Sequence, residues 1–100
     1  MAKVYEFLAN GFEEIEGLAP VDILRRGGID VTTVSITGSR EVTTSHGVTI
    51  LADTTFEDAG EMADADLLML PGGMPGSTNL NAHAGVLSTM RRQFDSGKLV

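Results

Sequence analysis

Short apolar runs alternate with longer amphipathic stretches along this chain, and glycine or proline marks most of the boundaries between them. Residues 4–9 and 30–36 are rich in aliphatic, aromatic or β-branched side chains, which is typical of strands. Residues 67–70 are all apolar and are followed by Pro71, Gly72 and Gly73. This pattern predicts a short strand buried on both faces in the middle of a parallel sheet.

A helix is predicted over residues 13–26. The helix dipole favours acidic residues in the first turns, here Glu13, Glu14 and Glu16, and basic residues in the last turn, here Arg25 and Arg26. Gly27 and Gly28 end the helix. We interpret both arginines as complements of the helix C-terminus, with a dimer interface as the alternative. The apolar residues cover more than one stripe, so we expect the sheet on one side and a partner subunit on the other.

The rest of the pattern completes an α/β order. Residues 41–44 and 48–51 predict two short strands around a turn, and residues 55–62 a short acidic helix begun by a threonine cap. Residues 74–79 form a polar loop that could include a helical turn. A clearer helix is predicted over 84–94, and residues 98–100 begin another strand; the helix face is Leu87, Met90, Arg91 and Phe94. The order predicts a doubly wound, mostly parallel sheet that is incomplete in this chain.

Pro20 lies inside the first predicted helix, where it cannot donate to the carbonyl of Glu16 and costs roughly 3 kcal/mol. Gly17 adds a penalty of about 1 kcal/mol relative to alanine. A helix bent at these residues would aim the Glu16 carboxylate at a site. A kink tolerated for packing explains the same residues without a site, and the two explanations stay open.

Gly72 and Gly73 follow the predicted central strand, at the edge where open α/β sheets bind their ligands. Without a Cβ, glycines let backbone N–H groups face a ligand closely. The same residues are also ordinary turn formers, so their pattern alone does not distinguish a binding loop from a plain turn.

Composition restricts the classes of partner. The 7 basic and 14 acidic residues give a net charge of −7, which disfavours nucleic acid and acidic membrane surfaces. No apolar run is long enough to span a bilayer, and Glu6 falls where a signal peptide needs an apolar core, so we expect a cytoplasmic protein. The chain has no cysteine, and we expect no metal and no cofactor. His46 and His83 are interpreted as surface or turn residues.

Two motifs are similar to those of the ThiJ/PfpI superfamily. One is the run from Ala9 to Glu16, continued by residues 20–28, and the other runs from Asp66 to Gly73. The resemblance covers essentially all 100 residues in register, and it is closest to the branch of the parkinsonism-associated deglycase/chaperone protein and its bacterial relatives. It implies that residues 1–100 are the N-terminal part of a single flavodoxin-like domain, usually dimeric, ending before the nucleophile elbow.

The resemblance also implies a site. The family's nucleophile is a cysteine on a strand-to-helix elbow, expected here just after residue 100. Glu16 corresponds to a protonated carboxyl that hydrogen-bonds the cysteine sulfur, and Gly72 and Gly73 correspond to the loop whose N–H groups bind an oxyanion. His46 falls near a position where relatives often carry an arginine that reaches the partner subunit, and there this chain departs from the family's pattern.

The function implied by the resemblance is cofactor-free conversion of reactive α-oxoaldehydes, of the glyoxalase or deglycase type, with Glu16 as acid/base. The alternative is a redox-sensing, chaperone-like stress protein that uses the same cysteine and Glu16 without turnover. Peptidase activity, known in a more distant branch, needs a histidine directly after the nucleophile. A nucleotide-binding function is not supported, because the loop at Gly72 and Gly73 is not a GxGxxG motif. The expected partners are small aldehydes, a second copy of the chain and a complementary C-terminal fragment, and the 100-residue piece alone is not expected to be active.

Overall fold

Four parallel strands form the main sheet of the computed structural model, which describes residues 2–100. Their order is β5-β2-β1-β6, where β1 is Lys3–Leu8, β2 is Asp30–Ser35, β5 is Thr54–Thr55 and β6 is Leu67–Met69. Val4 of β1 lies opposite Val31 of β2 and Leu67 of β6. The predicted α/β fold with a parallel sheet is confirmed.

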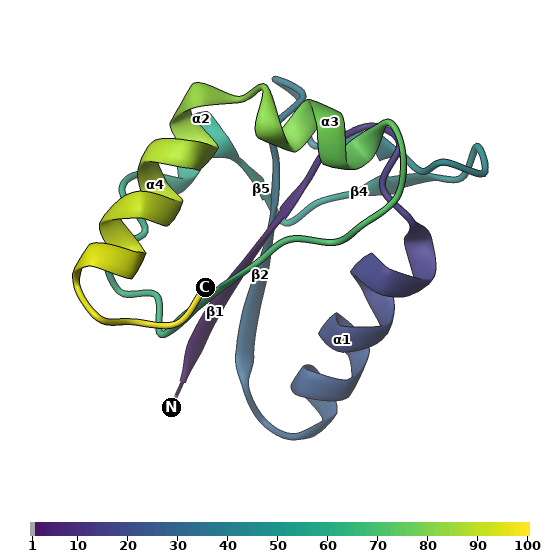
Figure 1. The fold of residues 1–100 in the computed structure, drawn as a ribbon. Helices are drawn as coiled ribbons and strands as arrows, with labels where there is room; N and C mark the ends of the chain where they lie inside the picture. The colour runs from purple at the N-terminus through teal and green to yellow at the C-terminus, as the bar shows by residue number, and fades with distance from the viewer. Residues whose placement is uncertain (1) are drawn as a thin grey trace.

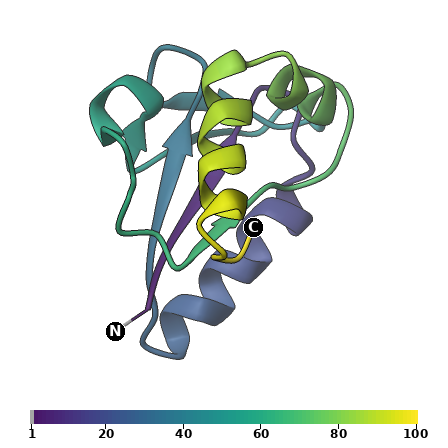
Figure 2. The same ribbon diagram turned by 60° about the vertical axis from the view of Figure 1, so that its left-hand side comes forward.

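Helices cover both faces of this sheet (Figures 1 and 2). Helix α1 (Glu14–Arg26) lies on one face, and the short α2 (Phe56–Ala59) and α4 (Ala84–Asp95) lie on the other. Helix α3 (Gly76–Asn81) crosses near the carboxyl end of β1. Strands β3 (Glu41–Thr43) and β4 (Thr49–Leu51) form a separate antiparallel hairpin.

Strand β1 supplies side chains to the apolar layers on both faces. Tyr5, Phe7 and Ala9 belong to the larger core cluster, which also holds Leu80 of α3 and Val86 of α4. On the other face, Val4 packs with Val21 of α1, and Leu8 packs with Phe12. Because side chains alternate along a strand, Glu6 points to the same face as Val4 and Leu8, which is the face covered by α1.

The strand predicted over residues 67–70 is present as β6, with parallel partners on both sides, but its predicted burial on both faces is incomplete among residues 2–100. Strand β6 ends the order of named strands, pairing with β1 on one side and, through a single bridge, with Leu99 on the other. Leu68 is buried, but Leu67 and Met69 are half-buried and Leu70 is 44% exposed. The strand expected at residues 98–100 is present as one parallel bridge between Leu99 and Leu67, so the chain returns beside β6.

Three shorter elements also differ from the predictions. The helix predicted over 55–62 is only α2, because Gly60 takes a φ of 74° after it; the Thr55 cap is confirmed and accepts from the Asp58 N–H. The helical turn allowed for within residues 74–79 is present, but as α3 it extends to Asn81. Residues 54–55, which we did not predict as a strand, pair with β2 as β5.

Of the face identified on α4, only Met90 packs against the core. Leu87 and Phe94 are exposed, Phe94 by 70%, and the buried residues of the helix are Val86, Thr89 and Gln93. The Gln93 side chain turns inward because its amide donates to the carbonyl oxygens of Ala65 and Leu99. A polar residue that satisfies backbone carbonyls can occupy a buried position that an apolar pattern would not assign to it.

Helix α1 continues through Pro20 from Glu14 to Arg26. Gly17 has a packing reason, because a Cβ at that position would lie 2.6 Å from the ring of Phe12. No helix among the described residues is long and apolar enough to cross a membrane.

Candidate functional site

Two loops meet at the carboxyl ends of β1 and β6. Residues 9–13 connect β1 to α1, and residues 70–75 connect β6 to α3. The Glu13 N–H donates to the Gly72 carbonyl at 3.0 Å, and the Gly76 N–H donates to the Gly11 carbonyl at 3.1 Å. These bonds fix the first turn of α1 against the loop that follows β6.

Glu16 and Gly72 are in direct contact at this junction. The Gly72 N–H donates to Glu16 Oε1 at 3.0 Å. A Cβ at position 72 would lie 2.3 Å from the same oxygen, so the approach requires glycine. The structure therefore brings together two of the three residues that the sequence pointed to. In this arrangement the Gly72 N–H is engaged by the carboxyl, and its oxyanion-binding role stays a prediction.

Gly73 occupies a conformation and a space that exclude other residues. Its φ is +97°, and a Cβ there would lie 2.5 Å from the backbone nitrogen of Glu13. Its carbonyl accepts from the Ser77 N–H at 2.8 Å, whereas its own N–H donates to no acceptor among residues 2–100. Of the two predicted oxyanion donors, Gly73 is the one that could meet a ligand.

Glu16 lines an open depression along β6, which we call the Glu16 hollow. Its volume is about 370 Å³, and its other lining residues are Glu6, Pro20, Leu67, Leu68, Met69, Leu70, Met90 and Val100. Two carboxyl groups, from β1 and α1, thus share a cavity whose described lining includes no basic side chain. The remaining lining residues are apolar, and the two acids differ in environment, because Glu6 is buried and Glu16 is exposed to solvent.

Glu6 is the residue of this hollow that sequence reasoning missed. It is 1% exposed, and its Oε1 atom is buried with no hydrogen-bond partner among the described residues. Burial raises the pKa of Glu6 from 4.5 to about 8, because the ionised form would lose its hydration. The available signal was an acid in the middle of an otherwise apolar strand, a position that faces the core whichever way the strand is oriented.

A second polar cluster joins α1 to the β3–β4 hairpin. Glu14 accepts from the Thr44 hydroxyl and from His46 Nδ1, and His46 Nδ1 is 3.8 Å from Glu13 Oε2. The Thr44 and His46 bonds lower the pKa of Glu14 to about 2, and Glu14 raises the pKa of His46. Exposed His46 sits in the hairpin turn as predicted, but its partner Glu14 was not foreseen.

This cluster is also the one group of potential metal ligands among the described residues. The ligand atoms of Glu13, Glu14 and His46 lie within 4.8 Å of one another. However, Glu13 Oε1 caps α1 by accepting from the N–H groups of Ile15 and Glu16, and Glu14 is paired with His46. The cluster is thus satisfied by its own hydrogen bonds and explains the attachment of the hairpin.

We expect Glu14→Gln to lower the pKa of His46 toward 6.5, because the carboxylate stabilises the imidazolium. The stabilisation that the His46 imidazolium contributes is fully present below pH about 6.5 and is lost as pH rises through the raised pKa of His46. The Glu14 contribution is present above pH about 4.5 and is lost as pH falls toward 2. Nuclear magnetic resonance titration of the imidazole measures the shift. Glu57→Gln, on α2, is the charge control, and equal His46 values in wild type and Glu14→Gln would contradict the assignment.

Other predicted polar residues have structural partners. His83 Nδ1 accepts from the Val86 N–H at 3.0 Å and thereby caps α4. Arg25 pairs with Asp53 at 2.7 Å and also donates to the Val31 carbonyl, so it ties α1 to the strand layer. Arg26 pairs with Asp22 one turn back along the helix.

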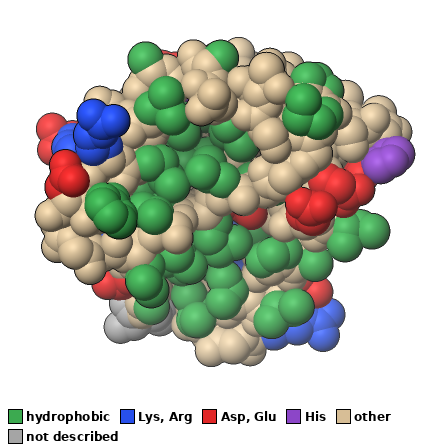
Figure 3. Space-filling model, in the orientation of Figure 1, with side chains coloured by type: hydrophobic (Ala, Val, Ile, Leu, Met, Phe, Trp, Pro, Cys, Tyr) green, Lys and Arg blue, Asp and Glu red, His purple; other side chains and the backbone are tan. Residues whose placement is uncertain are grey.

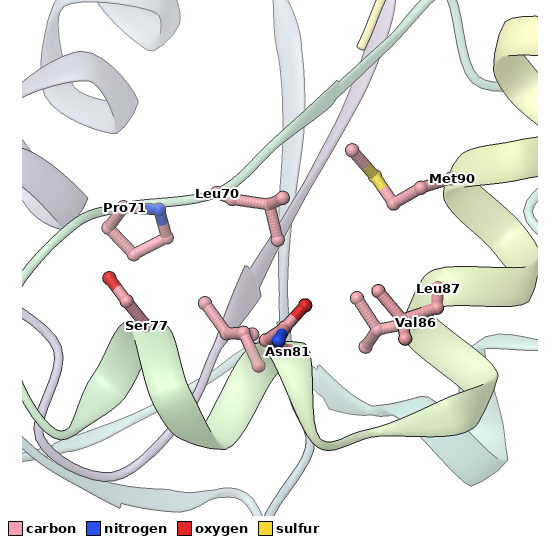
Figure 4. Close-up of a pocket in the computed structure, with 8 residues that line it drawn as sticks. Leu70, Pro71, Ser77, Asn81, Val86, Leu87 and Met90 are labelled. Carbon is pink, nitrogen blue, oxygen red and sulfur yellow. The ribbon is translucent and has the colours of Figure 1, made fainter.

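An apolar pocket of about 240 Å³ lies between the start of the loop of residues 70–75, which we call the glycine loop, and the helices α3 and α4 (Figure 4). Figure 4 shows side chains of all three segments converging there; the lining residues are Leu70, Pro71, Ser77, Leu80, Asn81, Val86, Leu87 and Met90. Apolar side chains also gather over the middle of the face in Figure 3, with acidic side chains and a histidine at its edge. The pocket offers apolar contacts and no ionisable group, so acid–base chemistry would come from the Glu16 hollow.

Residues 2–100 match the model of the DJ-1/PfpI family. The chain is 40% identical over 86 residues to the Parkinson disease protein 7 homolog of Danio rerio, covering 86% of this chain and 46% of that protein. It is 37% identical over 97 residues to the protein DJ-1 homolog B of Arabidopsis thaliana, covering 97% of this chain and 22% of that protein.

Solved structures give the same result. Oxidized DJ-1 of Toxoplasma gondii superposes with a TM-score of 0.94 at 33% identity, over 99% of this chain and 53% of that one. A cysteine-to-alanine mutant of a DJ-1 superfamily protein from Salmonella typhimurium has a TM-score of 0.93 at 42% identity, with coverage of 99% and 53%. The flavodoxin-like fold is thereby confirmed, and the chain spans about half the length, or less, of these relatives.

Proposed function

The chain belongs to the DJ-1/PfpI family. We propose that the full-length protein converts small reactive α-oxoaldehydes without a cofactor. The observation that carries this proposal is the 3.0 Å contact between Glu16 and the Gly72 N–H at the carboxyl ends of β1 and β6. A carboxyl group and a glycine loop at that edge supply an acid/base and backbone donors, which the addition of a nucleophile to a carbonyl needs.

The proposed reaction is the conversion of methylglyoxal and water into lactate. A cysteine thiolate, expected beyond residue 100, would add to the aldehyde carbon, and the electron pair of the C=O bond would move to oxygen. The Gly73 N–H would stabilise that oxygen, and Glu16 would take the proton from the former aldehyde carbon and return it to the neighbouring one. Water would then release the acid and regenerate the thiol.

A second candidate function is redox sensing with a chaperone-like role. The Toxoplasma relative was solved in an oxidized form, which supports oxidation as an alternative use of the same site. A carboxyl at the position of Glu16 could hold an oxidised sulfur by a hydrogen bond. In that case peroxide would modify the protein, and no aldehyde would be consumed.

The assembly and compartment are part of the proposal. Ile15 and Ile23 of α1 are exposed, which supports a homodimer that covers this helix. Small aldehydes, a second copy of the chain and the remaining part of the domain are the proposed partners, and the cytoplasm is the proposed compartment.

The test of the proposed function is a methylglyoxal assay on the full-length protein without added cofactor. We expect lactate to appear as methylglyoxal disappears. Failure to form lactate, together with a peroxide-dependent mass increase on cysteine, would replace the first candidate with the second.

We expect Gly72→Ala to lower methylglyoxal turnover by about 100-fold, because the new methyl group displaces the Glu16 carboxyl from its position. The clash is with the end of a flexible side chain, so the free energy of unfolding should change by less than about 1 kcal/mol. Steady-state kinetics and urea denaturation measure the two effects. Gly27→Ala is the matched control, because its Cβ would meet other atoms only at 3.5 Å or beyond. Normal turnover in Gly72→Ala would show that the Glu16 position is not needed.

A further inference from the structure

A separate cavity lies at the carboxyl ends of β1 and β2, and we call it the Asn10 cavity. Its volume is about 320 Å³, in the range of small-molecule sites, and its apolar lining residues are Ala9, Ile36 and Ala82. No residue of β6 or of the segment 98–100 lines it, and β1 separates β2 from β6 in the sheet, so the cavity lies away from the open edge beyond β6. The carboxyl ends of strands are where open α/β sheets bind their ligands.

Three polar side chains of the Asn10 cavity are each held at one end by the backbone. Asn10 Oδ1 accepts from the Thr43 N–H at 3.0 Å, and Asn79 Nδ2 donates to the Asn10 carbonyl at 2.8 Å. His83 Nδ1 accepts from the Val86 N–H at 3.0 Å. A backbone N–H only donates and a backbone carbonyl only accepts, so these bonds fix which end of each side chain is already used.

The opposite ends of the same three side chains have no hydrogen-bond partner among residues 2–100. They are the Nδ2 group of Asn10, the Oδ1 atom of Asn79 and the Nε2 atom of His83. Because His83 Nδ1 accepts a hydrogen bond, the neutral ring carries its proton on Nε2. The cavity therefore has two N–H donors and one oxygen acceptor. The fourth polar lining residue, Thr37, adds nothing to this set, because its hydroxyl bonds to carbonyls of its own loop.

These three groups define the chemistry of a complementary ligand. The described lining residues include no acidic side chain, lysine or arginine, so none of them would neutralise a charged ligand. Two donors match a carbonyl oxygen, which has two lone pairs, and one acceptor matches an N–H group. A carboxamide carries this oxygen and this N–H group on a single carbon atom. The apolar part of the lining suits a small hydrocarbon or aromatic body attached to it.

We propose that the Asn10 cavity binds a small uncharged carboxamide. The carbonyl oxygen of the ligand accepts from Asn10 Nδ2 and His83 Nε2, and its N–H group donates to Asn79 Oδ1. Because the backbone already holds one end of each side chain, binding costs little side-chain entropy. This site is distinct from the junction of Glu16 with the glycine loop, and it does not depend on the proposed reaction.

The test is a titration of the full-length, isotope-labelled protein with nicotinamide, followed by nuclear magnetic resonance. We expect the side-chain signals of Asn10, Asn79 and His83 to shift in a saturable way. Nicotinic acid has the same shape, but its carboxylate is charged and has no N–H group, so it should bind at least about tenfold more weakly. A titration without saturable shifts of these signals, or equal binding of nicotinic acid, would overturn the proposal.

Two substitutions change the free end of a side chain and keep its backbone bond. Asn10→Asp keeps an oxygen for the Thr43 N–H but loses the Nδ2 donor, and His83→Ser keeps an oxygen that can cap α4 but loses Nε2. We expect each to weaken nicotinamide binding about tenfold, the value of one hydrogen bond. Ser88→Asp, which adds a charge at an exposed position of α4, should bind like wild type. Binding by both variants within about twofold of wild type would show that these side chains serve only local structure.

Discussion

Glu16→Gln in the full-length protein should lower methylglyoxal turnover by about 10³-fold, within the range for loss of a general acid/base. Glutamine can still accept from the Gly72 N–H that Glu16 Oε1 accepts from at 3.0 Å, so the junction between α1 and the glycine loop should remain. It cannot exchange a proton with the substrate. We therefore expect turnover to fall far more than the free energy of unfolding, and stopped-time lactate assays with urea denaturation measure both.

The control for this substitution is Glu57→Gln, which removes an exposed carboxylate from α2 and leaves the junction untouched. Its turnover should match wild type. Unchanged turnover in Glu16→Gln would contradict the acid/base role of Glu16. A loss of turnover accompanied by a large loss in the free energy of unfolding would instead indicate that Glu16 is needed for folding. Only a loss confined to turnover supports the proposed reaction.

Glu6→Gln should make the full-length protein more resistant to alkaline conditions. The pKa of Glu6 is raised by burial to about 8 in the folded state, against 4.5 for an unperturbed glutamate. Between these values the folded protein keeps a proton that the unfolded chain releases, so wild-type stability falls as pH rises from about 4.5 to about 8. The difference between these two pKa values corresponds to a loss of up to roughly 5 kcal/mol in the free energy of unfolding.

Glutamine does not titrate, so this loss is absent in Glu6→Gln. We expect the difference in the free energy of unfolding between variant and wild type to move in favour of the variant by several kcal/mol, up to roughly 5, from pH 5 to pH 9. Urea denaturation at a series of pH values measures it, and Glu57→Gln corrects for the lost charge. A difference that stays constant with pH would mean that Glu6 titrates normally and that its oxygen is solvated.

The local pattern predicts much of this fold because most of its elements follow short-range rules. Helix α1 lies where acidic and basic ends and a glycine stop place it, and Glu13 begins it as a cap. The β1 and β2 strands lie where β-branched and aromatic runs occur. The glycine loop at Gly72 and Gly73 lies at the carboxyl end of β6, as its position after an apolar run indicated.

Long-range packing decided the rest. The strand order β5-β2-β1-β6 follows from the crossovers, which the apolarity of single runs does not determine, and Leu70, after the end of β6, is partly exposed. On α4, Gln93 points inward, where its amide donates to the backbone carbonyl of Ala65, far from it in sequence, and to that of Leu99, just after the helix. A helical-wheel projection contains only the helix itself, so it cannot indicate hydrogen-bond acceptors on other segments of the chain.

The site divides in the same way. The sequence by itself pointed to Glu16, Gly72 and Gly73, since a carboxylate between glycine and proline and a glycine pair after a strand are visible in one dimension. Only the tertiary structure paired Glu16 with Gly72, joined Glu14 to His46, and buried Glu6 in the hollow beside Glu16. The reason is physical, because the burial and the partners of a charged group are properties of the three-dimensional neighbourhood, which residues distant in the chain create.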